Sequence, residues 1–178
     1  MKGILKRLTL VTLVLAMAMT LMAGPSMAGS SMTEDEQISE VYGYIFEREA
    51  TALGRFQTWP LEEKAAFSDW VRHLAEQGNE VAKRELSTGV YSVPGKDNMT
   101  LEEATELTRQ GIIAKYGVEE EALVGNTYVE AAFYTRFFDY EAPHWQIGFQ
   151  IKGVGNFYVE IVDRTKEITI WGPGESVG

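Results

Sequence analysis

The sequence predicts an α+β protein, in which N-terminal helices are followed by one more helix packed on an antiparallel sheet of three to four strands. Up to about residue 123, apolar residues recur at the three- and four-residue spacing of amphipathic helices. After Gly125 the spacing changes to every second residue, as in half-buried strands, and turn-forming residues divide this part into separate strands. Helices first and strands afterwards is the order of an α+β fold.

The first helix is expected from Thr33 to about Gly54. Thr33 and Glu36 form a capping box, in which side chain and backbone satisfy each other's unpaired donors. Apolar residues follow the cap at helical spacing, namely Ile38, Val41, Tyr42 and Ile45. Gly54 is a suitable C-terminal stop.

The second helix is expected to begin near Pro60, whose fixed φ suits a first helical turn. One face carries an apolar stripe, formed by Phe67, Trp70, Val71 and Leu74. Gly78-Asn79 interrupts the helix, and residues 80–86 continue it as a short piece. Residues 87–98 contain turn-forming pairs such as Pro94-Gly95, so we expect a connector made of turns.

The third helix is expected from Thr100 to Gly117, with one more short turn of helix at 118–123. Thr100 and Glu103 form a second capping box. One side of this helix carries Leu101, Ala104, Thr108, Ile112 and Tyr116. This side is expected to pack against the sheet.

The strands are expected at about 128–135, 144–151, 157–161 and 168–170. The clearest is 144–151, where Trp145, Ile147, Phe149 and Ile151 alternate with His144, Gln146, Gly148 and Gln150. The turns between the last three strands fall at 153–156 and 163–166. The sheet is therefore an antiparallel meander with one buried face.

The first 28 residues have the features of a secretory signal peptide. Lys2, Lys6 and Arg7 give a basic start, residues 8–22 are uncharged and apolar, and Ser26-Met27-Ala28 offers small residues to a signal peptidase. We expect cleavage after Ala28, with Ala23 as the alternative. The mature protein is then secreted or extracytoplasmic, at the cell surface or wall.

A retained membrane anchor is the alternative to cleavage. A spanning helix needs about 20 apolar residues, and this apolar run is shorter and ends in Gly24-Pro25. We therefore expect no stable membrane span after the signal is removed. Residues 29–97 form a helical region with its connector and 98–178 an α+β region, and 29–178 are expected to make one compact unit.

The composition restricts the partners. The formal net charge is −10 and falls to −13 without the three basic residues of the signal. A chain this acidic repels nucleic acids and anionic membranes. We therefore exclude both as partners. The chain has no cysteine, so an exported form would be held by its core alone, without disulfides.

Residues 98–171 resemble the PepSY domain. The similarity lies in three segments: a capped helix that opens Met99-Thr100-Leu101-Glu102-Glu103-Ala104, the strand Trp145–Phe149, and the hairpin from Tyr158 to Ile168. The hairpin departs from the family pattern. One residue is missing between Asp163 and Thr165, and Lys166 stands where Gly is usual. Because a lysine at positive φ would be strained, we expect a different turn type.

The resemblance implies an exported, non-catalytic module. PepSY domains occur in propeptides of secreted metallopeptidases and as isolated exported domains, and peptidase inhibition or folding assistance has been proposed for them. Residues 56–65 and 91–95 are also similar to segments that precede PepSY-like regions in exported bacterial proteins. The resemblance brings no catalytic constellation, and it implies no cofactor.

The sequence offers no catalytic, cofactor or metal site. His73 and His144 are the only histidines and lack metal-ligand spacing. No Gly-x-Ser-x-Gly elbow is present. Glu160 and Asp163 are candidates for paired carboxylates, but a turn explains Asp163 and the polar side of a strand explains Glu160.

Three tyrosines are the candidate partner-contact residues, namely Tyr128, Tyr134 and Tyr158. They alternate with the apolar residues of the predicted strands, so they belong to the sheet face turned away from the third helix. If that face is open, it is an interaction surface, since tyrosine favours such places. The alternative is that Trp59, Phe67 and Trp70 from the helical half cover it.

The first functional hypothesis is an exported binding module of unknown protein partner, with an extracellular peptidase as the partner that the resemblance implies. An exposed edge strand would favour binding by strand addition. The alternatives are a small extracytoplasmic enzyme with an unrecognised site, or a small-ligand carrier with a pocket between helices and sheet. An enzyme would have a concave pocket with converging carboxylates and shifted pKa values.

Overall fold

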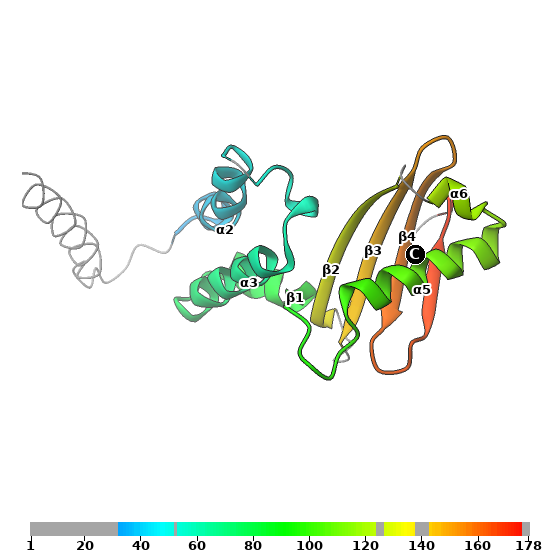
Figure 1. The fold of residues 1–178 in the computed structure, drawn as a ribbon. Coiled ribbons are helices and arrows are strands. Elements are labelled where there is room, and N and C mark those ends of the chain that lie inside the picture. The colour runs from blue at the N-terminus through cyan, green and yellow to red at the C-terminus, as the bar shows by residue number, and fades with distance from the viewer. Residues whose placement is uncertain (1–31, 52, 124–126, 138–142, 176–178) are drawn as a thin grey trace, which may run out of the picture. The chain divides into compact units, whose positions relative to one another are not determined.

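The computed structural model describes residues 32–51, 53–123, 127–137 and 143–175, without the side chains of 127–129. The predicted signal segment, 1–28, lies outside the described residues. Helices and a five-stranded antiparallel sheet follow each other in the predicted order (Figure 1), so the α+β fold class is confirmed. No helix in the described ranges is long and apolar enough to cross a membrane.

The N-terminal half consists of α2 (Glu34–Glu49), the 3-10 turn η1 (Phe56–Thr58), α3 (Leu61–Glu76) and α4 (Glu80–Thr88). Thr33 and Glu36 form the predicted capping box at the start of α2. Asn79 caps α4 by accepting a hydrogen bond from the Ala82 amide at 2.9 Å. These helices share a small core of their own, made of Val41, Phe67, Val71, Leu74, Val81 and Ala82.

The sheet contains β1 (Gly89–Tyr91), β2 (Thr127–Phe137), β3 (His144–Ile151), β4 (Gly155–Val162) and β5 (Ile168–Trp171), hydrogen-bonded in chain order. The sheet therefore has five strands, whereas three or four are predicted from the sequence. The additional strand, β1, comes from the connector predicted to contain turns only. Val90 pairs with Arg136 of β2, so this strand is fixed by a partner distant in sequence rather than by a local pattern.

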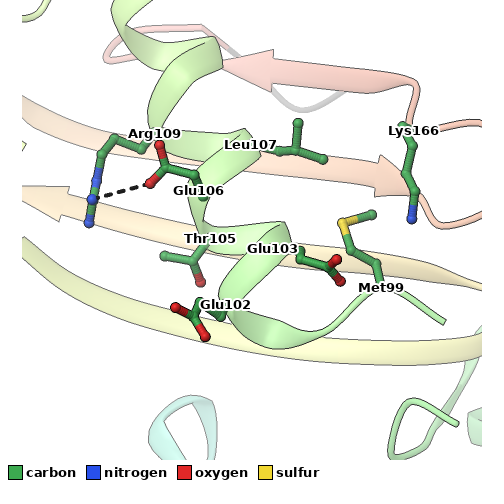
Figure 2. Close-up of a pocket in the computed structure, with 8 residues that line it drawn as sticks. All are labelled: Met99, Glu102, Glu103, Thr105, Glu106, Leu107, Arg109 and Lys166. Carbon is green, nitrogen blue, oxygen red and sulfur yellow. Dashed lines mark hydrogen bonds and ion pairs between the residues drawn. The ribbon is translucent and has the colours of Figure 1, made fainter. Parts of the chain in front are cut away.

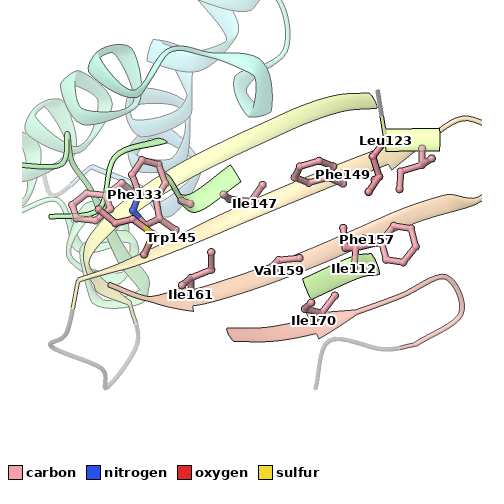
Figure 3. Packing of buried hydrophobic residues seen from close by; sticks show 13 residues of the cluster. Ile112, Leu123, Phe133, Trp145, Ile147, Phe149, Phe157, Val159, Ile161 and Ile170 are labelled. Carbon is pink, nitrogen blue, oxygen red and sulfur yellow. The ribbon is translucent and has the colours of Figure 1, made fainter. Parts of the chain in front are cut away.

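In the second half of the chain, α5 (Leu101–Tyr116) covers one face of the sheet (Figure 1). Thr100 and Glu103 form the second predicted capping box, and Gly117 ends the helix at φ 66°. The short α6 (Glu120–Leu123) follows. Between helix and sheet lies the main core, whose labelled strand residues point to one side (Figure 3): Phe133, Trp145, Ile147, Phe149, Phe157, Val159, Ile161 and Ile170. Ile151 belongs to the same core.

Gly111 lets α5 come close to β5. A Cβ at this position would lie 2.6 Å from Cδ1 of Ile170 and 3.0 Å from Cδ1 of Ile168. Since contacts this short do not occur between relaxed atoms, any larger residue would push the isoleucine side chains aside. The glycine therefore sets how closely the helix packs on the edge of the sheet.

The turn between β4 and β5 differs from our expectation. We expected the turn to avoid a positive φ at Lys166, but Lys166 has φ 60° and donates its backbone N–H to Val162 O at 2.8 Å. That expectation is wrong. Asp163 begins the turn, and its buried carboxylate accepts hydrogen bonds from Met99 N at 2.7 Å and from Asn98 Nδ2 at 3.0 Å. The turn is thus tied to the start of α5, and this tie holds it although Lys166 is strained.

Candidate functional site

The second face of the sheet, opposite α5, is covered at one end only. Lys64 of α3 reaches the Ala131 carbonyl of β2 at 2.6 Å, so the N-terminal half lies against β1 and part of β2. The other half of this face carries mostly polar and aromatic side chains that are partly or fully exposed, namely Glu130, Gln146, Gln150, Asn156, Tyr158, Glu160, Thr169 and Trp171.

The three candidate tyrosines have different surroundings. Tyr134 is buried and packs against Tyr91 of β1, with ring centroids 4.7 Å apart, and against His144 at 5.3 Å. Tyr158 remains partly exposed and lies 5.7 Å from the Trp171 ring. The backbone of Tyr128 belongs to β2, but its side chain is outside the described residues. Only Tyr158 among the described candidates lies on the uncovered part of the face.

Of the three aromatic residues proposed as a cover, Phe67 contacts the sheet, with its ring centroid 6.5 Å from that of Tyr91 in β1. Phe67 and Trp70 pack against Tyr44 of α2, with ring centroids 5.8 and 5.9 Å away. Trp59 is buried and contacts Phe56 at 5.0 Å. Phe56 in turn contacts Tyr91 at 5.4 Å. The helical half therefore meets β1 through Phe56, Phe67 and Ser68, which contact Tyr91. It meets β2 through Lys64.

A groove runs over the uncovered face in two connected parts. The inner part, of about 200 Å³, lies against the N-terminal half and is lined by Phe56, Gln57, Lys64, Tyr91, Ala131, Ala132, Tyr134 and Gln146. The outer part, of about 820 Å³, extends to Trp171 and Pro173. Glu130, Gly148 and Tyr158 line both parts and form the passage between them.

Gly148 leaves the floor of this passage open. A Cβ on Gly148 would lie 3.6 Å from Cβ and 3.7 Å from Oε2 of Glu130, so the glutamate side chain stands beside the position that glycine leaves empty. Both distances are ordinary van der Waals contacts, and Gly148 has no positive φ. A larger residue would therefore fit the strand and fill the groove.

Lys64 is the buried cation of the inner part. Its Nζ donates to Gln57 O at 2.8 Å and to Ala131 O at 2.6 Å, and the residue is only 3% exposed. Burial lowers the pKa of Lys64 to about 8, and the charge of Glu130 acts in the opposite direction. Among the described residues, none donates a hydrogen bond to the Glu130 carboxylate.

The phenols around the groove are held neutral. Burial raises the pKa of Tyr134 above its usual range, and the neighbouring Tyr91 adds to the effect. Burial also raises the pKa of Tyr158, and Glu160 adds to it. Near pH 7 both phenols therefore act as hydrogen-bonding groups without charge.

The sequence analysis missed Lys64. It lies three residues before Phe67 and seven before Val71, on the buried stripe of α3. A lysine within an apolar stripe was the available signal, because lysine is almost never fully buried unless its charge is satisfied. Glu130 and Gly148 gave no comparable local signal.

A second hollow, of about 740 Å³, follows the outer side of α5 (Figure 2). Two of its three acidic side chains already have partners. Glu103 accepts from Thr100 N at 2.7 Å in the capping box, and Glu106 pairs with Arg109 at 3.3 Å. These contacts account for the residues by helix stability alone, so we do not treat this hollow as a site.

The edges of the sheet do not favour strand addition. At the β1 edge, the Tyr91 N–H is taken by Ser68 Oγ at 2.8 Å. At the β5 edge, the Ile170 carbonyl accepts from Lys115 Nζ at 2.6 Å and from Tyr116 OH at 3.2 Å. A partner strand would have to displace these side chains, as expected for edges protected against pairing.

Metal binding has no support in the part of the chain that the structure describes, where no three His, Asp or Glu side chains are grouped as a metal site requires. His73 lies on α3 and shares a hydrogen bond with Gln77 at 2.8 Å. His144 is buried between Tyr134 and Phe137, at ring distances of 5.3 and 5.1 Å. The two histidines therefore have separate surroundings.

Comparison with known proteins adds no relative: no protein-family model, no curated protein and no solved structure matches the chain.

Proposed function

We propose that the protein is an exported, non-catalytic binding module that holds an extended segment of a partner protein in the groove on the uncovered sheet face. The observation that carries this proposal is the pair of Tyr158 and Trp171. Their rings lie 5.7 Å apart, and both remain partly exposed beside Gly148. Aromatic side chains of this kind are enriched in protein interfaces, where they bury a large apolar area and keep a polar atom available.

The lining of the outer groove supports a polymer segment rather than a compact ligand. Its volume of about 820 Å³ is open along one side and continues into the inner part. Gln150 and Asn156, opposite each other on β3 and β4, add side-chain amides that can donate to and accept from a peptide backbone. Because side chains already hold a backbone group at each sheet edge, the groove is the more accessible route to a partner.

Export and the partner class are the parts of this proposal that rest on the sequence. The basic start, apolar run and small residues before Gly29 support secretion. A capped helix followed by antiparallel strands is also the order that the PepSY resemblance implies. An extracellular peptidase is for this reason the first partner to test.

The experiment combines capture with a variant that fills the groove. The chain from Gly29 onward is used as bait in extracellular and cell-wall fractions of its source, and bound proteins are identified by mass spectrometry. Gly148→Leu places a side chain on the groove floor, while Gly43→Leu adds the same group on α2, where a Cβ meets nothing within 4 Å. A partner bound stoichiometrically by the parent and the Gly43→Leu variant, but lost with Gly148→Leu, supports the proposal. Equal capture by all three contradicts it.

A small-ligand carrier is the second candidate, and the position of the inner cavity favours it. That cavity lies between the helical half and the sheet, but its volume of about 200 Å³ is below the 300–1,000 Å³ usual for drug-sized ligands. Trp171 lines only the outer part of the groove. Trp171→Ala should therefore weaken binding of a protein segment and leave binding of a small ligand unchanged.

A further inference from the structure

One of the three N–H donors of the Lys64 ammonium has no hydrogen-bond acceptor among the described residues. A lysine ammonium carries three donors, and two of them are taken by the carbonyls of Gln57 and Ala131 at 2.8 and 2.6 Å. The third has no acceptor among the described residues. Since Lys64 lines the inner cavity and is 3% exposed, that cavity is the space open to the third donor.

A buried ammonium in this state favours an anionic acceptor. The two carbonyls are neutral, and Glu130, whose charge favours the ammonium, makes no hydrogen bond with it. Taking a charge out of water is costly unless an opposite charge or strong acceptors replace the water. Aromatic rings of Phe56, Tyr91 and Tyr158 line the same cavity and place apolar surface beside the ammonium. In such surroundings a charge-assisted hydrogen bond is stronger than at the surface.

The groove ends where Lys64 lies. Beyond the inner cavity, Tyr134 fills the face by packing against Tyr91 at 4.7 Å and against His144 at 5.3 Å. On the opposite side the groove continues past Gly148 to Trp171. A chain lying along the groove can therefore pass outward but cannot continue inward, so the position at Lys64 suits the end of a chain.

We infer that the inner end of the groove binds the C-terminal carboxylate of a peptide chain, which accepts the third N–H of Lys64 while the chain runs outward over Gly148 toward Trp171. This inference rests on the proposed function, because it names the part of the partner that the groove holds. It adds an end-specific ligand to a groove that could otherwise take any extended segment.

Glu130 makes this position selective among anions. Its carboxylate stands in the passage beside Gly148 and would repel a second negative charge on the ligand. A peptide end carries a single carboxylate followed by backbone N–H groups, and those N–H groups are donors that Glu130 can accept. A polyanion would place further negative charges, instead of N–H donors, beside Glu130, so its binding is disfavoured.

In the test, the full chain is immobilised and exposed to an equal mixture of two sets of random octapeptides. One set ends in a free carboxylate and the other in an isotope-labelled C-terminal amide. Mass spectrometry of the retained peptides gives the acid-to-amide ratio. We expect at least about tenfold enrichment of the acids, the ratio that one added charge-assisted hydrogen bond supports. Lys64→Gln should bring the ratio to about one. Lys83→Gln, which changes an exposed lysine paired with Glu80, should leave it unchanged.

The outcomes separate this inference from the proposed function. If peptides are enriched but acids and amides are retained equally, the carboxylate site is overturned and the proposed binding groove is still supported. Enrichment of neither kind overturns both. An acid preference that survives in Lys64→Gln overturns the assignment to Lys64.

A second measurement needs no variant, and so does not depend on Lys64→Gln folding. The amide resonances of Gln57, Ala131 and Ala132 are followed by NMR during titration with N-acetylphenylalanine and with its amide. We expect these resonances to respond to the acid at a concentration about tenfold lower, and equal responses would contradict the inference. Benzoate tests whether the source is a small carboxylic acid: a response as strong as that to N-acetylphenylalanine overturns the preference for a chain end.

Discussion

Lys64 Nζ donates a hydrogen bond of 2.6 Å to the backbone carbonyl of Ala131, which connects a helix of the N-terminal half to the second strand of the sheet. The same nitrogen donates to Gln57 O at 2.8 Å in the 3-10 turn before that helix. A single buried ammonium thus holds three elements together and forms the inner end of the groove.

Replacing Lys64 with methionine should destabilise the fold. Methionine fits the length of the side chain, but it leaves the Gln57 and Ala131 carbonyls without their donor, and each buried unpaired group is costly. Methionine also removes the cost of burying a charge, and this gain offsets part of the loss. We expect the free energy of unfolding to fall by about 2 kcal/mol, measured by urea denaturation. Lys83→Met, at an exposed position, should change it by less than about 0.5 kcal/mol.

Stability should rise between pH 7 and pH 10 because of Lys64. The pKa of Lys64 is about 8 in the folded state against 10.5 for a free lysine. Over this range the unfolded chain binds more protons than the folded one at Lys64, so the free energy of unfolding increases with pH. We expect a gain of about 2 kcal/mol from this residue. Urea denaturation at several pH values measures it, and the same rise in Lys64→Met would contradict the assignment.

Above about pH 10 the tyrosines reverse the trend. Burial raises the pKa of Tyr42 to about 12, with a further contribution from Glu85, and burial also raises the pKa of Tyr158 and Tyr134. The folded state therefore keeps these protons after an unfolded chain has lost them, and the free energy of unfolding decreases as pH rises further. We expect a maximum near pH 10, where the two effects meet.

The parts of the fold predicted from the sequence are those with local causes. The capping boxes at Thr33 and Thr100 satisfy donors within one helical turn, and the strand at 144–151 has an alternation that needs no distant partner. The unpredicted parts depend on contacts between distant residues. Val90 becomes part of a strand because Arg136 lies beside it, and Lys64 becomes a site because η1 and β2 bring two carbonyls to it.

The alternation in the sequence predicts which side chains share the groove face, but not which of them stay exposed. Tyr134 and Tyr158 do lie on the same sheet face, as period-two spacing requires. That the helical half buries one and leaves the other exposed depends on the position of Phe56 and Tyr91. No local pattern in the sequence contains that information.

Asp163 should be essential for the link between the last hairpin and α5. Its two carboxylate oxygens accept from Met99 N at 2.7 Å and from Asn98 Nδ2 at 3.0 Å. In Asp163→Asn one of these acceptors becomes an NH₂ group facing another donor. We expect a loss of about 2 kcal/mol in the free energy of unfolding, because the residue is buried and its bonds are charge-assisted. Asp97→Asn, at the exposed neighbouring turn, is the matched control and should have little effect in the same urea experiment.

Lys166→Gly should stabilise the protein. Lys166 has φ 60°, where a Cβ costs about 1–2 kcal/mol and glycine has no such penalty. Glycine loses more chain entropy on folding, which cancels part of the gain, so we expect a net increase of about 0.5 kcal/mol in the free energy of unfolding. The side chain is exposed and the Lys166 N–H bond to Val162 O is kept by glycine. Arg164→Gly, in the same turn without a positive φ, should destabilise instead. If both glycine variants lose stability, then the strain at Lys166 is smaller than its φ implies.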